Sequence, residues 1–331
     1  MTPSHSARAG APPRVPAVSS GEVLCVGEVL WDSLPEGLFL GGAPFNVACH
    51  LRATGTAVSM VSRVGNDRLG DEVLRRAARY GVGTDLVQID DGLPTGFVRV
   101  HVDERGNGSY EICEPVAWDA IEATEALLAR TAAARAIVFG SLAQRNATTR
   151  ATLERLWRVA ARDALMVFDV NLRPPFEDVE SVRASLATAN VVKLSDAELV
   201  RLCEWFGWED SNQRAMMRGL ARQFDCAVVC VTRGSQGAAL LHDGEYTEHP
   251  GFPAEVRDTV GAGDAFLAVL LAGLLAGSSD AELLQHANLM GAYVVTQFGA
   301  LPADQGAAIA PPDASSPPPR PRPRQVKRRG R

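Results

Sequence analysis

The chain has 331 residues, a hydrophobic content of 46% and a formal charge of −6, which allow two domains or one large α/β body. Residues 317–331 hold six Arg, one Lys and no acid, so the rest of the chain is more acidic than the total indicates. An acidic body argues against a nucleic-acid-binding fold and leaves only the tail for such a role. No apolar run is long and clean enough to span a membrane.

The two ends of the chain differ in composition from the part between them. Residues 1–20 and 303–331 are rich in Pro, Ser, Ala and Arg without periodic apolar positions, so we expect a disordered leader and a disordered tail. Residues 21–302 then form one body. The leader lacks the apolar core of a secretory signal, and the six scattered cysteines contain no C-x-x-C pair. We therefore expect reduced thiols and a cytoplasmic protein.

The first strand is predicted in the apolar run 22–27, which ends in glycine. Asp32 follows near its carboxyl end, where open α/β sheets bind ligands. Gly41 and Gly42 allow a close approach of backbone to ligand, and Asn46 offers both a donor and an acceptor. Considered individually, Asp32 and Asn46 could also have a purely structural role in a turn or as a helix cap.

Strand and helix patterns then alternate to the end of the body. Strands are expected at 58–65, 86–89, 136–140, 165–169, 190–194, 227–232 and 238–242. Helices are expected at 69–80, 147–161, 179–188, from Ser195, and at 211–223, 262–275 and 280–297. This alternation implies a mostly parallel sheet with helices on both faces.

One segment interrupts the alternation. Residues 97–103 and 109–113 alternate apolar with polar side chains, and 104–108 join them, which predicts a β-hairpin. We expect a small accessory sheet that forms a lid, built from about 28–45 and 94–116. An edge hairpin without function is the plain alternative.

The stretch Asp258 to Phe266 reads DTVGAGDAF and leads into a long apolar helix pattern. A glycine-rich helix start presents free N–H groups and the positive end of the helix dipole, so it can bind an anion. Asp264 would lie in the first turn beside that anion. A carboxylate in this position suits a proton acceptor for an attacking hydroxyl.

These features together resemble the ribokinase-like (PfkB) family of carbohydrate kinases. The segment 41–55, GGAPFNVACHLRATG, resembles the first family signature and DTVGAGDAF resembles the second. The resemblance covers about residues 21–302. Within the family, GEVLWDSLPEG, EPVAWD, DVNLRP and KLSDAEL look most like the fructokinase branch. It implies a three-layer α/β/α fold with a small β-sheet lid.

The resemblance also implies a reaction and its residues. Members transfer the γ-phosphoryl group of ATP to a primary hydroxyl, with Asp264 as the general base and Gly261, Ala262 and Gly263 as the anion hole. The remaining site residues fall into three groups. Sugar binding is implied for Asp32, Gly41, Gly42, Asn46 and Arg173, nucleotide binding for Lys193, Ser195, Thr232, Gly234, Gly237 and Asn288, and water-mediated Mg²⁺ binding for Glu198.

Two of these assignments carry an alternative. Ser195 and Glu198 also fit a plain capping box, and Ser195 stands where many members have Asn. A monovalent cation such as K⁺ near the second signature is a further implication. The small sheet could join two copies, as in relatives, or remain a free lid.

Fructose is the expected acceptor, with ribose, 2-keto-3-deoxygluconate or a nucleoside as alternatives within the family. A dinucleotide-dependent oxidoreductase would need G-x-G-x-x-G directly after the first strand, and Gly27 is followed by Glu28 and Val29 instead. A sugar sensor without catalysis would be expected to lose the base or the anion hole, and both are present.

Overall fold

The computed structural model describes residues 21–34, 37–102, 108–209 and 212–301. The predicted leader and tail lie outside these ranges. Within them, no helix combines the length and the apolar character needed to cross a membrane.

The centre of the described body is a nine-stranded sheet in the order β13-β12-β11-β10-β9-β8-β1-β4-β5. Its strands are β1 (Val23–Val26), β4 (Val58–Gly65), β5 (Val87–Asp90), β8 (Ala136–Gly140), β9 (Leu165–Asp169), β10 (Val191–Ser195), β11 (Val228–Thr232), β12 (Ala238–His242) and β13 (Glu245–His249). All neighbours are parallel except that β12 pairs antiparallel with β11 and with β13. The predicted mostly parallel sheet is confirmed.

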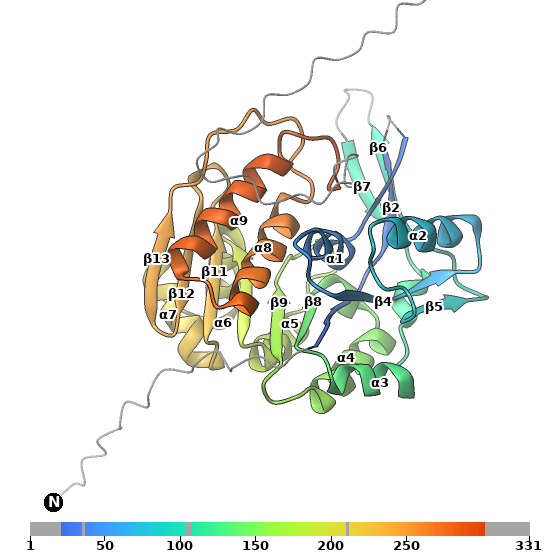
Figure 1. Cartoon of the computed structure of the whole chain (residues 1–331), viewed down its shortest axis with the longest axis horizontal. Coiled ribbons are helices and arrows are strands. Elements are labelled where there is room, and N and C mark those ends of the chain that lie inside the picture. The colour runs from blue at the N-terminus through green and yellow to red at the C-terminus, as the bar shows by residue number, and fades with distance from the viewer. Residues whose placement is uncertain (1–20, 35–36, 103–107, 210–211, 302–331) are drawn as a thin grey trace, which may run out of the picture.

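Helices cover both faces of this sheet (Figure 1). One face packs against α1 (Ala43–Ala53), α2 (Arg68–Arg79), α8 (Ala262–Ala276) and α9 (Asp280–Val294). The other packs against α3 (Glu125–Ala132), α4 (Ala147–Val159), α5 (Val179–Thr188), α6 (Asp196–Phe206) and α7 (Gln213–Phe224). Because strand side chains alternate, Val23 and Cys25 of β1 enter the first core, and Leu24 and Val26 the second. The predicted three-layer fold is confirmed.

The second sheet is small and has the order β3-β2-β6-β7. Its strands are β2 (Leu30–Leu34), β3 (Gly37–Gly41), β6 (Gly96–Val102) and β7 (Gly108–Ile112). It consists of two antiparallel hairpins, β2–β3 and β6–β7, joined by parallel pairing of β2 with β6. Figure 1 shows it standing beyond one end of the main sheet, above α2. The predicted accessory sheet is therefore present, and its action as a lid stays a prediction.

Strands β11, β10, β9, β8 and β1 are consecutive neighbours and run parallel, so their carboxyl ends meet at one edge of the sheet. This edge brings together Glu28, Asp169, Ser195 and Thr232, each at or just beyond the end of its strand. In an open α/β sheet this is where ligands bind.

Candidate active site

The loop before α8 is shaped by Gly261, which caps the helix with a left-handed φ of 78°. A Cβ at Gly261 would lie 2.4 Å from the Cβ of Ala300, so no side chain fits there. Ala262 and Gly263 begin the helix, and Asp264 follows in its first turn. The first N–H groups of a helix lack intrahelical acceptors, so this turn offers donors to an anion beside a half-buried carboxylate.

Asn46 contacts that carboxylate directly. Its Nδ2 donates to Asp264 Oδ2 at 2.8 Å, and its Oδ1 is buried without a partner among the described residues. Asn46 lies in the first turns of α1 and is 4% exposed. The structure therefore joins the two signature segments through one hydrogen bond.

Two glycines precede α1, one close to the backbone of Glu28 and the other close to the Asp32 carboxylate. A Cβ on Gly42, which has a φ of 111°, would lie 2.5 Å from the carbonyl oxygen of Glu28. A Cβ on Gly41 would lie 3.0 Å from Asp32 Oδ2. Burial raises the pKa of Asp32 to about 6, the Arg173 guanidinium lowers it, and Asp258 adds to the rise. Asp32 and the glycine pair thus share one polar corner where the small sheet meets the start of α1.

Arg173 lies on the loop after β9 and is exposed. Its Nη1 donates to the carbonyl of Leu172 at 3.0 Å. Its charge lowers the pKa of both Asp32 and Glu28, which places the guanidinium within electrostatic reach of the same corner.

A buried ion pair lies beneath the start of α8. Lys193 Nζ is 3.0 Å and 3.2 Å from the two carboxylate oxygens of Asp169, and both side chains are nearly inaccessible. A Cβ on Gly263 would lie 3.1 Å from Lys193 Nζ. Burial lowers the pKa of Lys193, but the charges of Asp169, Asp264 and Glu198 outweigh it and raise that pKa. An ammonium ion therefore lies against the predicted anion hole.

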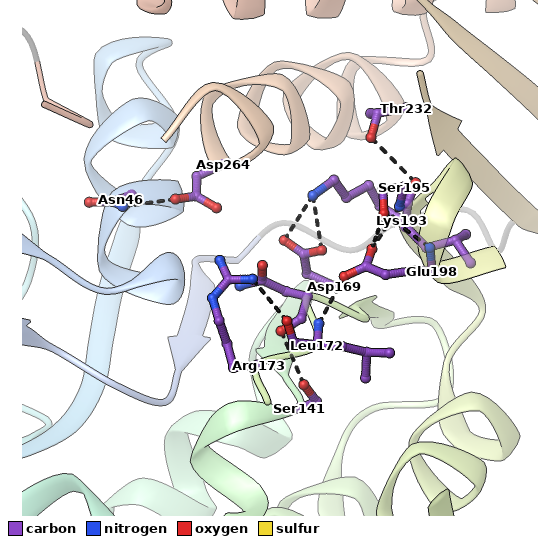
Figure 2. A network of polar contacts seen from close by, with 12 residues as sticks. Asn46, Ser141, Asp169, Leu172, Arg173, Lys193, Ser195, Glu198, Thr232 and Asp264 are labelled. Carbon is purple, nitrogen blue, oxygen red and sulfur yellow. Dashed lines mark hydrogen bonds and ion pairs between the residues drawn. The ribbon is translucent and has the colours of Figure 1, made fainter. Parts of the chain in front are cut away.

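Glu198 is held on both sides by the backbone. Its Oε2 accepts from Ser195 N at 2.7 Å and from Ser195 Oγ at 2.9 Å, and its Oε1 accepts from Leu172 N at 2.8 Å. The capping box that the sequence indicates is confirmed. The same carboxylate also ties α6 to the loop that carries Arg173. Figure 2 shows Arg173, Asp169, Lys193 and Glu198 on one side of Asp264 and Asn46 on the other.

The residues predicted for the nucleotide lie farther along the same edge. Thr232 ends β11 and donates from Oγ1 to the carbonyl of Leu194 at 3.4 Å. Gly234 has a φ of 55° and begins the short helix η3 (Gly234–Gln236). Gly237 has a φ of 79°, and a Cβ there would lie 2.0 Å from the carbonyl oxygen of His249, so packing alone requires this glycine.

Asn288 stands apart from this network. It is buried on α9 and donates from Nδ2 to the carbonyl of Leu284 at 2.7 Å. Its amide donor is therefore already used within its own helix.

Sequence reasoning gave no role to four further polar residues near this edge: Glu28, His50, Asp169 and Asp258. Glu28 and Asp169 carry the signal that singled out Asp32, an acid at the end of an apolar strand. Glu28 is 3% exposed, and its Oε1 accepts from Ala43 N at 3.3 Å. Asp258 accepts from Val260 N and from Gly299 N at 3.0 Å and 2.9 Å.

Comparisons with known proteins point to one family. The model of the pfkB family of carbohydrate kinases matches residues 37–305. Fructokinases of Klebsiella pneumoniae and Escherichia coli are each 30% identical to this chain, covering 86% of it and 96% of their own length. The solved structure of a Xylella fastidiosa fructokinase with bound ATP has a TM-score of 0.75 and 27% identity, and covers 85% of this chain and 95% of its own.

Proposed function

This chain belongs to the pfkB family of carbohydrate kinases, and from that premise we propose that it transfers the γ-phosphoryl group of ATP to free fructose, giving fructose 6-phosphate. The observation that carries the proposal is the hydrogen bond from Asn46 of α1 to Asp264. Asp264 lies in the first turn of α8, just after the glycine that caps this helix. The fructokinases among its relatives support fructose as the acceptor, and ATP is bound in the Xylella fastidiosa enzyme.

Asp264 acts as the general base in this proposal. Its carboxylate takes the proton of the primary hydroxyl as that oxygen attacks the γ-phosphorus, and the bond from phosphorus to the ADP oxygen breaks. The N–H groups of residues 261–263 stabilise the charge that develops on the transferred phosphoryl group. Asn46 keeps the carboxylate oriented toward the sugar.

Two charged residues assist the phosphates. The Lys193 ammonium lies against Gly263 and is placed to interact with phosphoryl oxygens. Both oxygens of Glu198 already accept backbone hydrogen bonds, and the described residues contain no cluster of three or more His, Cys, Asp or Glu that could hold a metal directly. These facts fit an outer role, in which Glu198 would hold water of a hydrated Mg²⁺. When bound with ATP, the ion neutralises phosphate charge.

The sugar lies in the corner formed by Asp32, Gly41 and Gly42. The Asp32 carboxylate accepts hydrogen bonds from sugar hydroxyl groups, and the glycines let the ring approach the backbone. The charge of Arg173 lowers the pKa of both Asp32 and Glu28, which favours their ionised forms in this corner. Segment 31–46 contains no Lys or Arg, which favours a free sugar over a phosphorylated one.

The nucleotide extends over Thr232, Gly234 and Gly237 toward helix α9, which packs against β12 and β13 and carries Asn288. We also place the enzyme in the cytoplasm, because none of its six cysteines, all within the described ranges, forms a disulfide and five are buried. Pairing of two copies through the small sheet and use of a monovalent cation stay predictions.

The test is ADP release by the purified protein with ATP and Mg²⁺ and a panel of acceptors: fructose, ribose, 2-keto-3-deoxygluconate, adenosine and fructose 6-phosphate. We expect fructose to give the highest kcat/KM. A stronger response to another acceptor would replace fructose but keep the kinase. ATP binding without turnover on any acceptor would contradict the proposal.

A further inference from the structure

Helix α1 carries a buried histidine that the proposed reaction does not use. His50 is 2% exposed, and its Nε2 lies 3.0 Å from the carbonyl oxygen of Ala300. A carbonyl oxygen only accepts, so Nε2 carries the proton. Burial lowers the pKa of His50 and favours the neutral ring. Nδ1 then carries a lone pair, and it has no hydrogen-bond partner in the described part of the chain.

Ala300 is the residue against which the anion-hole loop packs. The Cα of Ala300 lies 2.5 Å from the position that a Cβ on Gly261 would take, so the two backbones are in close contact. The neighbouring Gly299 N donates to Asp258 Oδ2, and Asp258 Oδ1 accepts from Val260 N. The turn at 299–300 is thus connected to loop 258–261 by the hydrogen bond to Asp258 and by the packing of Ala300 on Gly261. The hydrogen bond from His50 connects the same turn to α1.

His50 and Asn46 are four residues apart, so they share one face of α1. Asn46 donates to the candidate base Asp264, and His50 donates to Ala300 behind Gly261. One rigid helix therefore contacts both parts of the proposed phosphoryl-transfer machinery. Its first residue follows Gly42, which belongs to the proposed sugar corner.

We propose that His50 is a positioning residue whose Nε2–H bond to Ala300 sets the anion hole at residues 261–263 relative to Asp264. The inference rests on the proposed function, because it assumes that these residues carry phosphoryl transfer. Anion-hole donors act on charge that develops in the transition state, so their displacement lowers kcat with little change in KM.

The test compares three substitutions of this residue. His50→Leu removes the donor but keeps an apolar volume, and His50→Asn keeps polarity but is too short to reach Ala300. His50→Gln can place an N–H group near the position of Nε2. We expect kcat to fall about 10-fold or more in the Leu and Asn variants, with both KM values within about 3-fold, and to recover most of the loss in the Gln variant.

Cys49→Ala is the matched control, because Cys49 is also buried on α1 and is not placed in the site. It should lower Tm without changing kcat at 25 °C. Wild-type kcat in His50→Asn or His50→Leu would overturn the inference, as would an equal kcat loss in all three His50 variants. Turnover is measured with whichever acceptor the panel selects. A wrong acceptor therefore contradicts only fructose, and an unchanged kcat contradicts only the role of His50.

Discussion

Asn46 and Asp264 are 218 positions apart in sequence, and their side chains meet at 2.8 Å between Nδ2 and Oδ2. The amide is buried, whereas the carboxylate is half-buried. A fixed donor thus orients the carboxylate from the protein side and leaves it accessible from the other. The resemblance assigned Asn46 to the sugar, and the structure gives it a second contact, with the proposed base.

Replacing Asp264 by Asn should lower kcat by about 100-fold or more, because an amide cannot accept the hydroxyl proton. The KM for ATP should change little, since the substitution keeps the size of the side chain and leaves the helix start intact. Asp71→Asn is the matched control, an acid in the first turn of α2. Steady-state kinetics of both variants test this role. Near-normal turnover of the Asp264 variant would show that Asp264 is not the general base.

Asp32→Ala should raise the KM for fructose far more than the KM for ATP. Burial raises the pKa of Asp32 to about 6, and only in its ionised form are both oxygens purely acceptors of hydrogen bonds from sugar hydroxyl groups. The KM for fructose of the wild type should therefore rise as the pH falls below about 6, and Asp32→Asn should lose this dependence. Measuring both KM values from pH 5 to 8 checks it; equal effects on sugar and ATP would move Asp32 out of the sugar site.

The sequence pattern was sufficient to predict most strands of the main sheet, because these strands are short runs of buried apolar residues. Strand β4 has the predicted bounds 58–65, and β8, β9 and β12 also match. Other elements were missed or left unresolved. Strand β13 lies at the sheet edge with mostly exposed or half-buried residues, so it has no apolar run to detect. Helix α3 was missed because its eight residues are too few to show a clear helical period. Strands β2 and β3 were predicted only as part of the lid range 28–45.

The site was only partly predictable for a different reason. Motif spacing could place Asp264 at a helix start, but contacts such as Asn46–Asp264 and Lys193–Asp169 depend on how distant elements pack. No local pattern carries that information. The contact between Ser195 and Glu198 could be predicted, because a capping box joins residues only three positions apart and has its own sequence pattern.

Glu28 should make the stability of the fold depend on pH. Burial raises its pKa from an ordinary 4.5 to about 7, so the folded state binds this proton more tightly than the unfolded state. The free energy of unfolding is therefore unaffected by the ionisation of Glu28 below about pH 4.5. It falls as the pH rises through 7, by at most about 3 kcal/mol. Glu28→Gln cannot ionise and should become more stable relative to wild type as the pH rises from 5 to 8. Urea unfolding across this range measures the difference, and a constant difference would contradict the shift.

Arg145 and Asp119 form a buried pair whose loss should be costly. Arg145 Nε and Nη2 donate to the two Asp119 oxygens at 2.7 and 2.8 Å, and both side chains are 4% exposed. The guanidinium also donates to the carbonyl of Cys113 and lies over the rings of Trp118 and Phe176. Asp119→Leu should destabilise the fold by about 3–5 kcal/mol, because it leaves a buried charge unpaired.

The double variant Arg145→Met with Asp119→Leu should recover much of that loss, since no uncompensated charge remains. Arg201–Glu204 is the exposed control pair on α6, and its removal should change stability by less than about 1 kcal/mol. Chemical denaturation of the single and double variants gives the coupling energy. A strictly additive double variant would show that the pair contributes through packing alone.

Gly261 and Gly263 should respond differently to a single methyl group. At Gly261 the Cβ would meet the backbone and Cβ of Ala300, and its φ of 78° is strained for alanine, so Gly261→Ala should lower stability by about 1–3 kcal/mol and impair turnover. At Gly263 the nearest atom is Lys193 Nζ at 3.1 Å, the end of a flexible side chain that can move. Gly263→Ala should therefore keep the wild-type Tm but lower kcat, because the added methyl group displaces the ammonium from the proposed anion hole. Thermal unfolding and kcat of the two variants separate these effects. An equal loss of Tm in both would mean that Lys193 cannot yield, and wild-type kcat in Gly263→Ala would take Lys193 out of the reaction.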